Sequence, residues 1–87
     1  MQKTIWKFPL EITDRQAIEI PAGGHILSAG LDPSHVPSVW ALVDPKRSNV
    51  KHTIVICGTG RPVPKDVGRF IGSFVHLNAF VWHVFTA

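Results

Sequence analysis

The sequence has little of what small extracellular proteins rely on for stability and export. It contains a single cysteine, Cys57, so no disulfide can form within the chain. A lone thiol fits a reducing compartment, and we expect the protein to reside in the cytoplasm. Lysines interrupt the first apolar run at the amino terminus, which argues against a signal peptide.

Acidic residues are also scarce, with six against nine lysines and arginines and a net charge of +3. No pair of carboxyl groups has a spacing that suggests an acid and a base, and no serine lies in a Gly-x-Ser-x-Gly context. His52 and Cys57 lie an odd number of residues apart in one expected strand, so their side chains point to opposite faces. We therefore predict a protein that is not an enzyme and has no catalytic residue.

Metal-binding spacings are missing although the chain has five histidines. There is no Cys-x-x-Cys or His-x-x-x-His pattern, and zinc needs three or four ligands around one point. His76 and His83 fall in the expected terminal hairpin. If Phe74 faces Val81 across it, the two histidines share a face but lie too far apart for one ion. We predict no metal and no cofactor.

Long helical patterns are absent, and the prolines and glycines divide the chain into short pieces typical of an all-β fold. The last eighteen residues, 70–87, lack charge, but they contain several polar residues and are short for a membrane span. We expect one domain over residues 1–87: a small barrel or a two-sheet sandwich of about seven short antiparallel strands. The expected strands are Thr4–Leu10, Gln16–Ile20, His25–Leu31, Ser38–Val43, His52–Cys57, Phe70–Val75 and Ala79–Phe85.

The segment Gly58-Thr59-Gly60-Arg61 is glycine-rich and basic. Such a turn can direct backbone N–H groups and a guanidinium towards an anion, so Thr59 and Arg61 are candidate ligand-binding residues. It lacks the Gly-Lys-Ser/Thr of a nucleotide-binding P-loop. The alternative is an ordinary turn after a strand, in which glycine supplies positive φ angles.

A second basic segment runs from Asp44 to His52. Lys46, Arg47 and His52 are candidate anion-binding residues, and Trp40 is a candidate stacking surface. If the flanking strands pair as a hairpin, this loop lies at the opposite end of the molecule from Gly58–Arg61. The alternative is a solvated loop without a ligand.

The final strand is apolar on both faces: Phe80, Trp82 and Val84 lie on one face, and Ala79, Val81, His83 and Phe85 lie on the other. A strand of this kind needs cover on both sides. We predict a homo-oligomer, with a dimer as the simplest case, whose candidate interface residues are Val81, His83 and Phe85. The alternative is an inner strand of a plain sandwich.

Several motifs together resemble a family of small uncharacterised proteins that occur mainly in bacteriophages and prophage-bearing bacteria. These motifs are Met-Gln-Lys-Thr-Ile-Trp-Lys-Phe at 1–8, Trp-Ala-Leu-Val-Asp-Pro at 40–45, Gly-Thr-Gly at 58–60 and His-Val-Phe at 83–85. The resemblance covers nearly the whole chain. Relatives tend to have histidine where this chain has Arg61, so no role of that histidine is carried over.

The resemblance implies an accessory protein in the host cytoplasm, and small phage proteins of that kind often counter bacterial defence. Three functions stay open: sequestration of an anionic, nucleotide-like defence signal, inhibition of a host protein, and a role in phage structure or assembly. The low net charge argues against nucleic acid as the partner, and nothing in the sequence suggests a membrane partner.

Overall fold

The computed structural model describes residues 2–87, and within them it is all-β. Met1, the first residue of the opening motif, lies outside the described residues. The described chain has no helix long and apolar enough to cross a membrane. Its seven strands are β1 (Thr4–Pro9), β2 (Arg15–Pro21), β3 (His25–Leu31), β4 (Pro37–Val43), β5 (Asn49–Gly58), β6 (Phe70–His76) and β7 (Phe80–Thr86).

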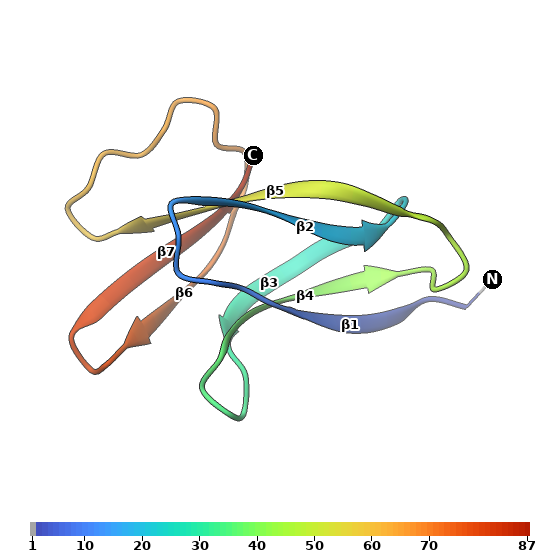
Figure 1. Ribbon diagram of the computed structural model, residues 1–87, viewed down its shortest axis with the longest axis horizontal. Helices are drawn as coiled ribbons and strands as arrows, with labels where there is room; N and C mark the ends of the chain where they lie inside the picture. Colours follow the sequence, from blue (N-terminus) through green and yellow to red (C-terminus); the bar gives the residue numbers. More distant parts are fainter. Residues whose placement is uncertain (1) are drawn as a thin grey trace.

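The strands form two antiparallel sheets, one of three strands in the order β1-β4-β3 and one of four in the order β2-β5-β7-β6 (Figure 1). The predicted all-β class is therefore confirmed. Of the two predicted architectures, the structure has the sandwich and not the closed barrel. Pro9 lies in β1, an edge strand, as its missing N–H requires.

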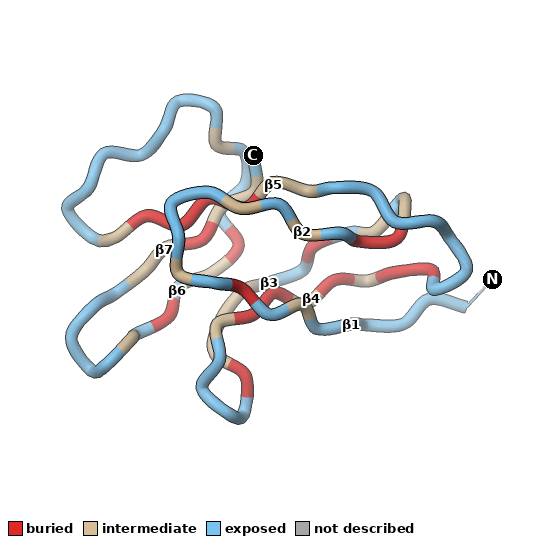
Figure 2. Tube along the Cα trace, viewed as in Figure 1, coloured by how far each residue is buried: buried red, intermediate tan, exposed pale blue. Residues whose placement is uncertain are grey.

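The core lies between the two sheets, and in β4 every second residue, Val39, Ala41 and Val43, is buried in it (Figure 2). In β2 the inward residues are Ile18 and Ile20, whereas Glu19 points outward and is exposed. In β7 Val84 is fully buried and Trp82 packs against the same core. The period-two alternation of the sequence thus predicts the inner face of both strands correctly.

One side of the sandwich is closed by a close contact between β3 and β6. A Cβ atom at Gly72 would lie 2.2 Å from the backbone oxygen of Ala29, so only glycine fits there. A few residues away, the guanidinium of Arg69 donates a hydrogen bond to the carbonyl oxygen of Ile26. The strands at this seam belong to different sheets, yet their backbones nearly touch.

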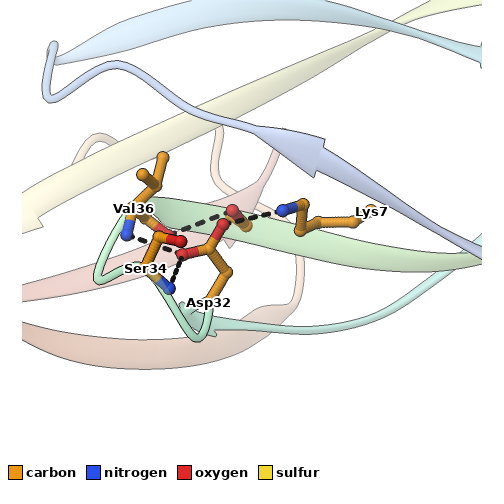
Figure 3. Close-up of polar contacts among 5 residues, drawn as sticks. Lys7, Asp32, Ser34 and Val36 are labelled. Carbon is orange, nitrogen blue, oxygen red and sulfur yellow. Dashed lines mark hydrogen bonds and ion pairs between the residues drawn. The ribbon is translucent and has the colours of Figure 1, made fainter.

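The connection between β3 and β4 is fixed by the buried carboxylate of Asp32 (Figure 3). It accepts hydrogen bonds from the backbone N–H groups of Ser34 and Val36 at 2.8 and 2.9 Å. The ammonium of Lys7 in β1 lies 2.7 Å from its second oxygen. These contacts, the hydrogen bond from Lys7 foremost, lower the pKa of Asp32 below its ordinary 3.8.

The outer face of the four-stranded sheet is covered over β5, where Val55 and Cys57 are 1% and 7% exposed. Both side chains line a cavity together with Pro62 and Pro64 of the long connection 59–69. An ion pair of 2.9 Å between Arg15 and Asp66 fastens this connection to β2. This cover lies over β5, whereas the second apolar face was predicted for the final strand, β7, where Val81 is exposed.

Two assumptions about pairing were wrong. The strands flanking the basic segment 44–52 do not form a hairpin, because β4 and β5 belong to different sheets. In the terminal hairpin Phe74 pairs with Trp82, not with Val81, so His76 and His83 point to opposite faces. A three-residue connection with positive φ at Leu77 and Asn78 sets this register.

Candidate functional site

The Gly58–Arg61 segment forms a tight turn at the end of β5. The N–H of Arg61 donates to the carbonyl of Gly58 at 3.1 Å, and Gly60 has a φ of 86°. This combination is typical of a type II turn, which favours glycine at its third position. The N–H of Thr59 donates to the carbonyl of Val81 at 3.2 Å and so attaches the turn to β7.

Gly58 has no side chain, and the ring of Trp82 and the stem of Arg61 both lie close to its backbone. It pairs with Trp82 across the sheet, and a Cβ atom at Gly58 would lie 3.1 Å from Cζ3 of that ring. The same Cβ would lie 3.7 Å from Cγ of Arg61. The Trp82 ring and the stem of Arg61 thus both border the space that a side chain at Gly58 would need.

A cavity of about 540 Å³, which we call the end cavity, opens between this turn and the tip of the terminal hairpin. Its lining is mostly apolar and includes Phe80, whose ring centroid lies 6.3 Å from that of Trp82 at an interplanar angle of 35°. The lining residues are Ile12, Gly58, Thr59, Arg61, His76, Leu77, Ala79, Phe80, Val81 and Trp82. Arg61 and Trp82 also line the neighbouring cavity of about 480 Å³ beneath the connection 59–69.

Two polar groups at the end cavity lack a partner within the part of the chain that the structure describes. The guanidinium of Arg61 is exposed and forms no ion pair or side-chain hydrogen bond with residues 2–87. The indole Nε1 of Trp82 is buried and donates to no acceptor there. A cavity lined by an unpaired cation and two aromatic rings suits an anion that carries a planar group.

A hydrogen-bonded polar group lies just outside the cavity on the outer face of β7. The two ring nitrogens of His83 lie 2.9 Å from the hydroxyl of Ser73 and 2.8 Å from that of Thr59. Cys57 is the register partner of His83, but its thiol is buried. Both imidazole nitrogens of His83 thus have a hydroxyl group as hydrogen-bond partner. The bond to Thr59 holds the side chain of this turn residue against β7.

The other predicted ligand-binding residues lie away from this site. Trp40 lies on the outer face of the three-stranded sheet, between Lys7 and Ser28 in register. Lys46 lines an open cavity of about 810 Å³ at the far end, where the backbone N–H of Lys46 donates to the carboxylate of Asp44. The structure thus brings Thr59 and Arg61 together but separates them from the remaining candidates.

Arg47 lies in the exposed turn at that same far end, where its N–H donates to the carbonyl of Asp44. His52, predicted as the last residue of the basic segment and the first of a strand, lies well within β5, which already begins at Asn49, and on the inner side of the sheet. Its Nε2 is buried and has no hydrogen-bond partner within residues 2–87. His52 is therefore not presented to a ligand alongside Arg47.

Sequence reasoning missed Trp82 and Phe80 as site residues. Their alternation in the terminal strand places them on one face, and by itself it indicates only a core pattern. The missing information was the register of β5 against β7, which sets Gly58 opposite Trp82. Two features of the sequence were available as a signal for this site. Gly58 directly follows a strand rich in β-branched residues, and Trp82 had been given no role in ligand binding.

Within residues 2–87 no group of three or more histidine, cysteine or acidic side chains is placed to hold a metal ion. No curated protein and no solved structure is significantly similar to the chain. The whole chain, residues 1–87, matches one protein family, which is described as a domain of unknown function. The protein is thus a member of the DUF7352 family.

Proposed function

We propose that the chain binds a small anion bearing a planar aromatic group, such as a nucleotide-like molecule, in the end cavity. The observation that carries this proposal is that Arg61, whose guanidinium forms no ion pair within residues 2–87, lines the same cavity as the ring of Trp82. A guanidinium binds phosphate through two parallel hydrogen bonds, and an aromatic side chain offers a stacking face to a base. The end cavity, at about 540 Å³, falls in the ordinary range for small-molecule sites.

The proposed role is sequestration, without chemical conversion, of a defence signal in the cytoplasm of a bacterial host. Its support is the resemblance of the sequence motifs to small bacteriophage proteins, together with the cation and rings described above. A binding protein of this kind needs no acid, base or nucleophile beside the ligand. It lowers the free concentration of the signal by mass action.

The test is a titration of the full chain with adenosine 5′-monophosphate, guanosine 5′-monophosphate and a cyclic dinucleotide, followed by calorimetry. Adenosine, which lacks phosphate, and inorganic phosphate, which lacks a ring, separate the two contributions. We expect Arg61→Ala to weaken nucleotide binding by about 10–100-fold, because it removes charge-assisted hydrogen bonds. Arg47→Ala at the far end removes the same charge and should leave binding unchanged.

The expected binding also weakens as salt rises, since exposed charges are screened. Circular dichroism of both variants checks that the fold is intact. If Arg47→Ala weakens binding and Arg61→Ala does not, the site lies in the far-end loop and the proposal is wrong. If no nucleotide binds at millimolar concentration, the nucleotide-like class is excluded.

A second candidate function, inhibition of a host protein, is favoured by Leu77 at the tip of the terminal hairpin. This side chain is 74% exposed and its φ is 55°, a conformation that costs leucine about 1–2 kcal/mol. An exposed leucine held in a strained turn is suited to insertion into an apolar pocket of a partner. Leu77→Gly should relieve the strain and abolish such an interaction, which a pull-down with the host protein would measure.

A further inference from the structure

The outer side of the terminal hairpin forms a face of three cross-strand pairs, which we call the hairpin face. The pairs are Phe70 with Phe85, Ser73 with His83 and Val75 with Val81. Phe70, Val75 and Val81 are 53%, 49% and 38% exposed, and the two phenylalanine rings meet edge to face at 5.6 Å. Apolar pairs thus lie on both sides of one polar pair.

The polar centre of the hairpin face is already satisfied within the chain. The two ring nitrogens of His83 lie within hydrogen-bond distance of the hydroxyls of Ser73 and Thr59, at 2.9 and 2.8 Å. Covering a polar group is costly mainly when the group loses its hydrogen-bond partners. The imidazole of this face can therefore be buried against an apolar surface while its nitrogens keep their partners.

The face also carries no charge, since residues 70–87 contain no aspartate, glutamate, lysine or arginine. This property points to a second copy of the chain as the occupant. In a two-fold contact the same patch lies on both sides, so a basic patch would repel its own copy. In a chain of net charge +3, the hairpin face can meet itself without that repulsion.

We infer that two copies of this chain associate through the hairpin face to form a symmetric dimer. Each strand of the face has seven residues, which corresponds to a length of about 23 Å. Two such strands cover less than the roughly 800 Å² per partner of a standard stable interface. We therefore expect a reversible dimer with a dissociation constant in the micromolar range.

The experiment is sedimentation of the full chain from about 1 to about 500 μM. The parent should shift from a monomer of 9.6 kDa towards twice that mass as concentration rises. Val81→Glu should stay monomeric throughout. Val63→Glu makes the same change at a valine that is 49% exposed in the connection 59–69, and it should dimerise like the parent.

Circular dichroism shows whether Val81→Glu is folded, and Val75→Glu, on the paired strand, replaces it if it is not. Because the face is uncharged, the dimer should persist at high salt. A parent that remains monomeric at every concentration would falsify the inference. A Val81→Glu or Val75→Glu variant that is folded and dimerises like the parent would move the interface elsewhere and also overturn it.

Discussion

Trp40 and Trp82 are two half-buried tryptophans, each with a cationic residue nearby, and the two cations differ in whether they have an acidic partner. Trp40 pairs in register with Lys7, whose ammonium is bound to the buried carboxylate of Asp32 at 2.7 Å. Trp82 lies beside Arg61, which has no acidic partner within residues 2–87. The first cation stabilises the fold, whereas the second is available to a ligand. An aromatic side chain near a cation therefore indicates a ligand-binding site only where the cation has no acidic partner within the protein.

The two tryptophans also differ in packing. Replacing each by alanine should therefore give the largest expected difference in the free energy of unfolding. Trp82 packs against the core from the inner face, whereas Trp40 lies on an outer face. We expect Trp82→Ala to lower the free energy of unfolding by about 2–4 kcal/mol, somewhat less than for a fully buried ring. Trp40→Ala should cost about 1 kcal/mol. Urea unfolding followed by circular dichroism measures both, and equal losses would contradict the distinction.

Substitutions of a glycine near each tryptophan, Gly58 near Trp82 and Gly30 near Trp40, should have an intermediate effect on stability. A side chain at Gly58 would press on the ring of Trp82, whereas a Cβ atom at Gly30, whose register partner is Ser38, would meet no atom beyond its chain neighbours within 4 Å. We expect Gly58→Val to cost about 1–3 kcal/mol through overpacking and to shift tryptophan fluorescence. Gly30→Val should change stability by less than about 0.5 kcal/mol. A neutral Gly58→Val would show that Trp82 moves freely.

The smallest expected effect on stability comes from removing the carboxylate of Asp32, which binds Lys7 near Trp40. Because the folded-state pKa of Asp32 is lowered below 3.8, its carboxylate stabilises the fold fully above that pH. This contribution is lost as the pH falls below 3.8 through the lowered folded-state value. We expect Asp32→Asn to lower the melting temperature at pH 7 and to flatten its decline in acid. Asp66→Asn, whose partner Arg15 is exposed, is the control and should shift the melting temperature less.

Much of the fold could be predicted because alternation and turn residues act locally. The range His25–Leu31 matches β3 at both ends, and Phe70–Val75 differs from β6 only by one residue at its end. The site was harder, because it depends on which strands pair and in which register. Nothing local in the sequence sets Gly58 opposite Trp82 or assigns β4 and β5 to different sheets. The prediction therefore found Arg61 as a candidate but did not place it near Trp82.

The contact between Gly72 and Ala29 also determines which strand edges of the two sheets are open to other chains. β3 and β6 are the outer strands of their sheets on one side, and exposed strand edges are templates for pairing with other chains. Since these two strands pack against each other through a glycine, neither edge is open to a foreign strand. Strand addition is thereby restricted to β1 and β2, and in β1 Pro9 lacks the N–H that an incoming strand would need.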